Sequence, residues 1–554
     1  MNRYTHRFQM SASAIVCSVA LLSATSLAAE APSLDEYPQY VSSFAASDSN
    51  VRSEAQAAWQ TICFTLGNGQ YEAQRKAACE KMCDSLSAGQ PRESALFILR
   101  QLERIALDES VIPLVKLTAS EDAEVADAAR RALQNNRSPA AHDALVTLLE
   151  ASTEANMTTR LINSLGYRAQ PESVAALAKQ LASDNASVQL AAARALTRIN
   201  SADAAMTVFT AWSNASGAQR EELAKAAIVC ANGCIRRKDS PQAQSILKSV
   251  YAESKLPAIQ AAAFQGQLNA AGDETAGLIV KALNGNHVLE QQLAVGQVRQ
   301  LSDTSIASLL KDLPSVLPTG QAALLTALAS RREHSALPAV EQACGSKDQG
   351  VKIAALEALG QLGTAAHTEL LLSHLTADEE VRSAASRSLS IIFDDGVDSI
   401  LLKRLAATRD DEKRSELISI LSSRRTPGLA DIVVQSDDLV SANAETRKQA
   451  TGILNRLGDE NHIAALVTSM TKIPATEHDN VAKTIVSICS RIPSKDNQAG
   501  PITDLYESLA PEHRPNLLSV AGRVGGKAAG EFIGSKLSSP SAIEKVAAST
   551  ALSN

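Results

Sequence analysis

Apolar residues recur with helical spacing between Asp348 and Gly363, in the stretch DQGVKIAALEALGQLG. The apolar positions of this stretch are Val351, Ala354, Ala355, Ala358, Leu359 and Leu362. Their i, i+3, i+4, i+7 spacing places them on one face of a helix. Asp348 is a suitable N-cap, because its carboxylate accepts hydrogen bonds from the free N–H groups of the first turn. Gly363 is expected to end the helix in the left-handed C-cap conformation.

The same pattern returns along most of the chain, as residues 122–133, 184–199 and 378–392, and more loosely as residues 445–458. Val125 and Val188 occupy the same position in two of these units and lie 63 residues apart, while Val351 and Val381 lie 30 residues apart. The repeat is therefore about 31 residues long, which predicts roughly fourteen helix pairs. One amphipathic unit that recurs in this way predicts an all-α fold, an α-solenoid of antiparallel helix pairs.

The motif Asp-x-x-Val-x-x-Ala-Ala-x-x-Ala-Leu-x-x-Leu-Gly of residues 348–363 resembles the short bacterial HEAT repeat, of the type first described in bilin lyases. The resemblance extends from about Ser110 to the end of the sequence and is weakest at residues 202–237 and 502–524. It implies a right-handed superhelix whose second helices line the concave side. It also implies binding or scaffolding rather than a reaction.

The first 28 residues have the pattern of an export signal. Arg3 and Arg7 are followed by an apolar run over residues 11–24 and by small residues that end at Ala28. This order predicts a signal peptide, residues 1–28, that is cleaved after Ala28 or Ala29. The alternative, a retained membrane anchor, would need a longer apolar run. We therefore expect an exported protein, periplasmic or secreted, without a membrane span after cleavage.

Two further segments precede the repeats. Residues 29–49 contain prolines and small polar residues and are expected to form a tether. Residues 50–106 are expected to form three helices whose lengths differ from those of the later units, which is typical of a terminal cap. The repeat array is then expected to cover residues 107–554.

Composition agrees with a helical array and restricts the partners. Hydrophobic residues make up 45% of the chain but aromatic residues only 3%, so the predicted core consists of Ala, Leu, Val and Ile. The formal charge of −7 becomes −9 when the signal peptide with its two arginines is removed. A mildly acidic protein is not suited to neutralising phosphates, so a nucleic-acid partner is not expected.

Seven cysteines follow the predicted signal peptide, and two CxxxC pairs place thiols one turn apart on a helix. The simplest interpretation is that these cysteines fill small buried positions. In an oxidising compartment a disulfide within the group Cys63, Cys79 and Cys83 is an alternative. A metal site is the least favoured interpretation, because no histidine lies near either pair.

No catalytic or cofactor-binding motif is evident. Residues 520–530, VAGRVGGKAAG, resemble a phosphate loop, but Ala521 and Ala528 replace its first glycine and its Mg²⁺-binding hydroxyl. The nine histidines are scattered, and no CxxCH haem-attachment motif is present. We therefore expect a non-catalytic protein without a metal or a cofactor.

One charged feature recurs on the predicted second helices. Arginines occupy similar positions of several repeats, namely Arg131, Arg194, Arg198, Arg387 and Arg456. They are candidates for a basic ribbon that binds an acidic partner. Alternatively they pair with acids of the next repeat and offset the helix dipole. Glu357 occupies the same position in the unit 348–363, and this interruption favours the structural interpretation.

The sequence therefore predicts an exported scaffold that binds a protein partner through the concave face of a solenoid. The alternative is an accessory protein of an extracytoplasmic degradative system that binds carbohydrate or another polymer. Sugar recognition commonly uses aromatic platforms, and Trp59 and Trp212 are the only tryptophans of the chain.

Overall fold

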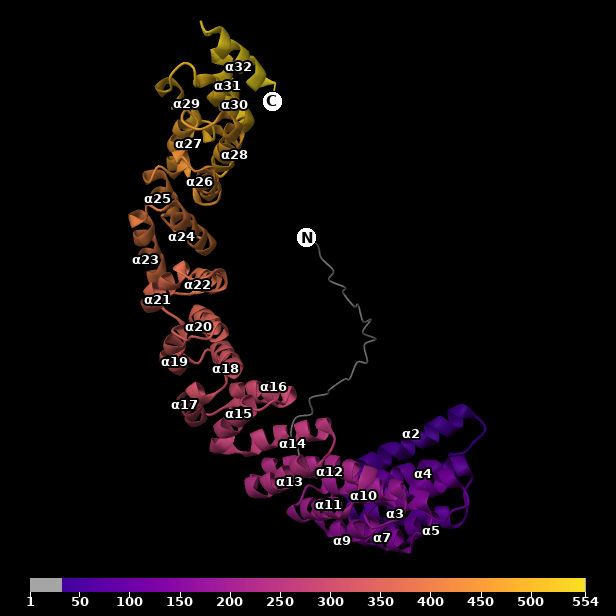
Figure 1. The fold of residues 1–554 in the computed structure, drawn as a ribbon. Helices are drawn as coiled ribbons and strands as arrows, with labels where there is room; N and C mark the ends of the chain where they lie inside the picture. The colour runs from indigo at the N-terminus through magenta and orange to yellow at the C-terminus, as the bar shows by residue number, and fades with distance from the viewer. Residues whose placement is uncertain (1–31, 554) are drawn as a thin grey trace. The chain divides into compact units, whose positions relative to one another are not determined.

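A computed structural model describes residues 32–553, and no strand occurs within this range. The expected signal peptide, residues 1–28, lies outside the described residues. The chain divides into two compact units, an N-terminal unit up to Ile246 and a C-terminal unit from Leu247 (Figure 1). Within the described range, no helix is both long enough and apolar enough to cross a membrane.

The N-terminal unit consists of helices that alternate between two stacked rows. Even-numbered helices, termed second helices from here on, each contact the next even-numbered helix, and odd-numbered first helices form the other row. The helices are α1 (Tyr37–Ser43), α2 (Ser49–Leu66), α3 (Glu72–Ser87), α4 (Arg92–Ile105), α5 (Val111–Leu117), α6 (Ala123–Asn135), α7 (Pro139–Ala151), α8 (Ala155–Arg168), α9 (Val174–Gln180), α10 (Ala186–Ile199), α11 (Ala202–Asn214) and α12 (Gly217–Arg236).

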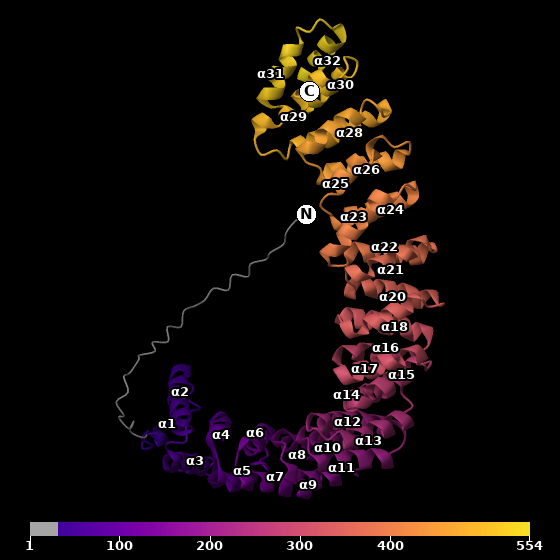
Figure 2. The ribbon, with the colours of Figure 1, turned by 90° about the vertical axis from the view of Figure 1, so that its left-hand side faces the viewer.

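The C-terminal unit repeats the same arrangement over a longer stretch (Figure 2). Helix α13 (Ser240–Glu253) contains the boundary between the units. The following helices are α14 (Pro257–Ala270), α15 (Thr275–Leu283), α16 (Val288–Gln297), α17 (Asp303–Asp312), α18 (Pro318–Arg331), α19 (Leu337–Cys344), α20 (Gln349–Leu362), α21 (Thr368–Ser373), α22 (Glu379–Ile391), α23 (Asp395–Ala407), α24 (Asp411–Arg424), α25 (Leu429–Gln435), α26 (Ala444–Leu457), α27 (Ile463–Ser469), α28 (His478–Cys489), α29 (Gly500–Thr503), α30 (Arg514–Val524), α31 (Gly526–Lys536) and α32 (Ala542–Leu552).

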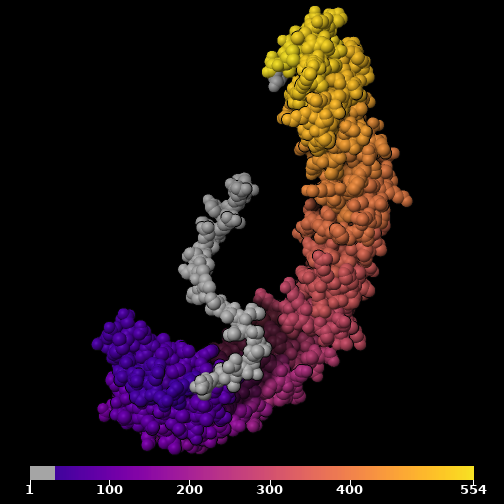
Figure 3. Space-filling view, turned by 180° about the vertical axis from the view of Figure 1, so that it is seen from behind, coloured from indigo at the N-terminus to yellow at the C-terminus, as the bar shows by residue number. Residues whose placement is uncertain are grey.

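The predicted α-solenoid is confirmed. Helices α5 to α32 form the fourteen pairs that the repeat length predicts, and α2, α3 and α4 occupy the expected cap region. The cap also continues the row of second helices, because α4 packs directly on α6. In the C-terminal unit each layer packs against the next without an intervening layer (Figure 3).

The expectation of a tether over residues 29–49 is wrong for its described part, because residues 37–43 form α1. The aromatic side chains at the two ends of this helix are buried. The ring of Tyr37 lies 4.5 Å from that of Trp59, and the ring of Phe44 lies 4.6 Å from that of Phe97. These contacts hold the segment against α2 and α4. Its prolines and small residues concealed the aromatic anchors in the sequence.

The ends of the best-formed repeat helix, α20, have different causes. The N–H of Val351 donates to Oδ1 of Asp348 over 3.0 Å, as the predicted N-cap requires. The predicted left-handed C-cap at Gly363 is wrong, since this residue is extended with φ −71° and ψ 164°. Glycine is needed there for another reason: a Cβ would lie 2.4 Å from the carbonyl oxygen of Leu359.

Small residues allow neighbouring second helices to approach closely. A Cβ on Gly166 of α8 would lie 2.7 Å from the Cβ of Ala195 on α10. In the same way, a Cβ on Gly360 of α20 would lie 3.0 Å from the Cα of Ser388 on α22. Small residues at these contacts bring the two backbones together, which explains the abundance of Ala and Gly on this face.

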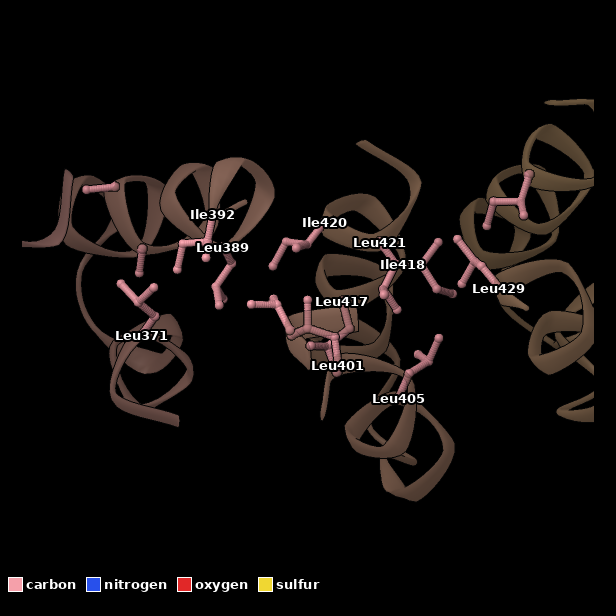
Figure 4. Close-up of a cluster of buried hydrophobic side chains, with 14 of the residues drawn as sticks. Leu371, Leu389, Ile392, Leu401, Leu405, Leu417, Ile418, Ile420, Leu421 and Leu429 are labelled. Carbon is pink, nitrogen blue, oxygen red and sulfur yellow. The ribbon is translucent and has the colours of Figure 1, made fainter. Parts of the chain in front are cut away.

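The core of each unit lies between the two rows and between consecutive layers. In the C-terminal unit, leucines and isoleucines of α21 to α25 interdigitate and are at most 3% exposed (Figure 4). The side chains labelled in this region are Leu371, Leu389, Ile392, Leu401, Leu405, Leu417, Ile418, Ile420, Leu421 and Leu429. Their contacts link every layer to the next, so the core runs along the unit rather than closing at one centre.

Candidate binding surface

Arginines of the second helices occupy two distinct positions relative to a buried core residue. At 100° per residue, a side chain three positions after the core residue points about 60° away from it. A side chain two positions before or after points about 160° away, toward solvent. The same residue type is therefore placed beside the core or on the outer surface by a shift of one position.

The arginines at the first of these positions hold the helix ends together. Arg424 donates from Nη1 to the carbonyl oxygens of Leu389 (2.9 Å) and Ile392 (2.7 Å) at the end of the preceding second helix. Arg331 donates to three carbonyl oxygens in the same way. The arginines of this class, which we term end-binding arginines, are Arg168, Arg237, Arg331, Arg424 and Arg491. They satisfy carbonyl groups that the helix itself leaves free.

The five candidate arginines all occupy the outward position, two residues from a buried leucine. Three have partners. Arg387 donates to Glu357 over 2.8 Å, Arg131 lies 3.4 Å from the carboxylate of Asp127, and Arg456 donates to a serine hydroxyl. Glu357, whose presence seemed to interrupt an arginine line, is therefore the partner of the arginine in the next repeat.

Arg194 and Arg198 differ from the other three candidates. Both are exposed on α10, and in residues 32–553 neither guanidinium group forms a hydrogen bond or an ion pair with another side chain. They lie two residues before and two residues after Leu196, which is fully buried. Their side chains therefore face solvent and leave the core contacts to the rest of the helix.

The same outward positions carry further arginines on the preceding second helices. Two residues before the buried leucine, α4, α6, α8 and α10 carry Arg100, Arg131, Asn163 and Arg194. Two residues after it, they carry Arg104, Asn135, Tyr167 and Arg198. Because these four helices pack in sequence, the eight side chains form two neighbouring rows across the N-terminal unit. We term this set the arginine surface.

Two depressions lie at the α4 end of this surface. One, of about 450 Å³, is lined by Arg100, Arg131 and Arg160 together with carboxylates of α4 and α6. The other, of about 620 Å³, is lined by Arg104, Arg137 and Tyr167 among others. Both include Arg100 and Glu103, so they adjoin. The surface is therefore hollowed where its charges gather.

Positive charge predominates on the surface and its rim. The guanidinium groups are those of Arg100, Arg104, Arg131, Arg137, Arg160, Arg194 and Arg198, and the nearby carboxylates are those of Glu103 and Asp127. Asp127 already contacts Arg130 at 2.9 Å and Arg160 at 3.6 Å. A local excess of positive charge on a chain of net charge −7 attracts anionic groups and repels cationic ones.

The same face of the C-terminal unit is not comparably charged. Along α20, α22 and α24, the position before the buried leucine carries Glu357, Arg387 and Ser419. The position after it carries Gln361, Ile391 and Ser423. The single cation of this group is neutralised by the ion pair between Arg387 and Glu357. The excess positive charge of the outward positions is therefore a property of α4 to α10.

The cysteines do not form a candidate site. Cys63, Cys79 and Cys83 are buried and free, so the structure contains none of the disulfides that the sequence left open. Burial raises the pKa of the Cys63 thiol to about 12 and that of Cys83 to about 11. Within the described range, no group of three or more His, Cys, Asp and Glu residues is arranged to hold a metal ion.

Both tryptophans belong to the core. Trp59 is fully buried and donates its Nε1–H to the sulfur of Met82 over 3.4 Å. Trp212 is 1% exposed and lies beneath the guanidinium group of Arg220. Tyr167, in contrast, is 63% exposed and belongs to the arginine surface. Neither tryptophan offers a flat exposed ring to a ligand.

Sequence reasoning found Arg131, Arg194 and Arg198 but missed their neighbours on α4. Arg100 lies 31 residues before Arg131, which is one repeat length. The signal was present, but the repeat array was expected to begin only at residue 107. The end-binding arginines were also missed, because their role depends on the carbonyl groups of another helix.

Comparisons with known proteins support the type of repeat. The family of HEAT repeats matches residues 306–390, which confirms the resemblance seen in the unit 348–363. No curated protein matches the chain. Solved structures similar to it include yeast importin-beta (Kap95p), with 13% identity and a TM-score of 0.35 over 94% of this chain and 87% of that chain. Another is Kap121p bound to Ste12p, with 12% identity and a TM-score of 0.36 over 93% of this chain and 67% of that chain.

Proposed function

We propose that the protein is an exported, non-catalytic scaffold that binds a protein partner on the arginine surface of its N-terminal unit. The observation that carries this proposal is the exposure of Arg194 and Arg198 without a side-chain partner. Long charged side chains lose conformational entropy when they are held in one place, so an unpaired cluster is free to gain partners on binding. Such a cluster contributes little to the stability of the fold.

The division of labour among the arginines supports this interpretation. The end-binding arginines already satisfy helix carbonyls, as Arg168 does for α6 and Arg237 for α10. The outward arginines of α4 and α10 are not needed for that purpose. A role outside the fold is the simplest reason for gathering them on neighbouring helices.

The location of the protein follows from the beginning of the sequence. Arg3, Arg7, the apolar run and the small residues before Ala28 have the order of a cleavable export signal. We therefore place the scaffold in the periplasm or outside the cell. Its partner is then a protein that occurs in the same compartment.

The carbohydrate-binding alternative has less support. A sugar platform needs exposed aromatic rings, and Trp59 and Trp212 are both buried. Tyr167 is an exposed ring, but it stands among arginines and amides rather than in an aromatic strip. We retain the alternative only as a second outcome of the binding experiment.

The experiment compares three forms of the mature chain in capture from a periplasmic extract. One is unchanged, one carries R194E and R198E, and the control carries K403E and R409E, which reverse two exposed charges on the C-terminal unit. We expect the unchanged chain and the control to capture the same proteins and the R194E/R198E form to lose them. Equal capture by all three forms, with equal helical content by circular dichroism, would contradict the proposal.

A further inference from the structure

We propose that the partner presents an extended acidic segment whose carboxylates form two groups, one for each end of the arginine surface. This inference rests on the proposed function and specifies the chemistry of the partner. Arg100 and Arg104 form the first cationic end, on α4, and Arg194 and Arg198 form the second, on α10. Uncharged Asn163 and Tyr167 lie between them on α8, and Asn135 lies on α6.

The spacing of the two ends sets the length of the segment. Packed helices lie about 8–10 Å apart, so the three steps from α4 to α10 span about 24–30 Å. An extended chain advances about 3.3 Å per residue, so eight or nine residues cover this span. Within each end the two arginines are one helical turn apart, about 5–6 Å, which matches two carboxylates close together on the segment.

The middle of the surface favours uncharged residues. On α6, the positive charge of Arg131 is partly offset by Asp127 at 3.4 Å, and Asn135 donates to Glu103 over 2.6 Å. On α8 the outward positions carry an amide and a phenol ring. The exposed ring of Tyr167 provides an apolar contact with a polar tip, which suits a neutral side chain. A carboxylate placed here would gain less than one placed at either end.

The pattern also distinguishes a protein segment from a uniform polyanion. Polyphosphate or a sulfated polysaccharide carries charge on every unit, so its central charges would face α8 without a guanidinium group at the outward positions. A protein can place its acids at the two ends and leave its centre neutral. The chain's charge of −7 opposes the approach of a highly charged polymer as well.

The test uses two fluorescent nine-residue peptides with the same composition and the mature chain. The first has two glutamates at each end and five neutral residues between them, and the second has the four glutamates together in the centre. We expect the first to bind about tenfold more tightly by fluorescence anisotropy, which corresponds to one additional ion-paired end. We also expect its affinity to fall as salt rises from 0.05 to 0.2 M.

Variants locate the contact. R194E/R198E and R100E/R104E should each reduce binding of the first peptide to that of the second, while K403E/R409E should leave it unchanged. Equal binding of both peptides, or polyphosphate binding that is equally tight and equally sensitive to R194E/R198E, would overturn the segment proposal.

The same experiments separate this inference from the proposed function. If the extract experiment succeeds while neither peptide binds, the scaffold role stands and the acidic segment is wrong. If R194E/R198E leaves both peptide binding and partner capture unchanged, both proposals fail.

Discussion

Replacing Arg424 and replacing Arg198 should have very different effects on stability, although both are arginines near the end of a second helix. The guanidinium group of Arg424 is 7% exposed. It donates to the carbonyl oxygens of Leu389 and Ile392, and its Nε lies 2.6 Å from Oδ1 of Asp398. The side chain of Arg198 is exposed and has no partner in the described range.

The magnitude follows from what each substitution leaves behind. Arg424→Ala removes three hydrogen bonds of a charged group, each with a net contribution of about 1.5–3 kcal/mol, and leaves Asp398 without its cation. Removing one partner of a buried ion pair costs about 3–5 kcal/mol. Asp398 is 22% exposed and also accepts from Thr426, so water and the hydroxyl compensate in part. We expect a loss of about 2–4 kcal/mol, compared with at most about 0.5 kcal/mol for Arg198→Ala.

An intermediate variant tests the geometry. Arg424→Lys keeps the charge but has no planar fork, so it cannot donate to the helix end and to Asp398 in the same arrangement. We expect a loss of about 1–2 kcal/mol, since part of the charge-assisted bonding remains.

The assay has to resolve local unfolding, because a repeat array need not unfold in a single step. Hydrogen exchange followed by mass spectrometry reports opening of α22 and α24 separately, and urea denaturation followed by circular dichroism reports the whole chain. Faster exchange should concentrate in these two helices for Arg424→Ala and be absent for Arg198→Ala. Equal losses for the two variants would refute the distinction between the two arginine positions.

Three further predictions concern other parts of the molecule. Gly166→Leu should strongly destabilise the N-terminal unit, because even a Cβ there meets Ala195 at 2.7 Å; unchanged urea denaturation would contradict this close approach. The seven described cysteines should react with a maleimide at pH 8 only after unfolding, and all seven should react without a reductant; a deficit of two thiols would reveal a disulfide. The mature chain recovered from the periplasm should begin at Ala29 or Glu30, and an intact mass that retains residues 1–28 would contradict the signal peptide.

Much of the fold could be predicted from local pattern. Each repeat carries its own apolar stripe, and helix N-caps such as Asp348 and Asp122 are visible in the sequence because they act on residues two or three positions away. The number of helix pairs followed from the repeat length for the same reason. The prediction failed for α1, whose stability depends on the distant rings of Trp59 and Phe97.

The candidate surface was only partly predictable. The sequence identified arginines at one position of the repeat, and Arg194 and Arg198 prove to be exposed there. It could not separate them from Arg387, because the partner of that arginine, Glu357, lies 30 residues away on another helix. The sequence also suggested that Glu357 broke the pattern, whereas in three dimensions it completes an ion pair.

The sequence by itself determined the helices, the repeat length and the stacking of helix pairs, because these depend on contacts within about one repeat. The tertiary structure decided the role of each arginine. Three residues after a core leucine, the side chain of Arg424 meets the carbonyl end of the preceding helix and becomes part of the fold. Two residues after such a leucine, the side chain of Arg198 points to solvent and is left free to bind. The physical reason is a rotation of 100° per residue, whose consequence depends on which neighbouring helix lies in the new direction.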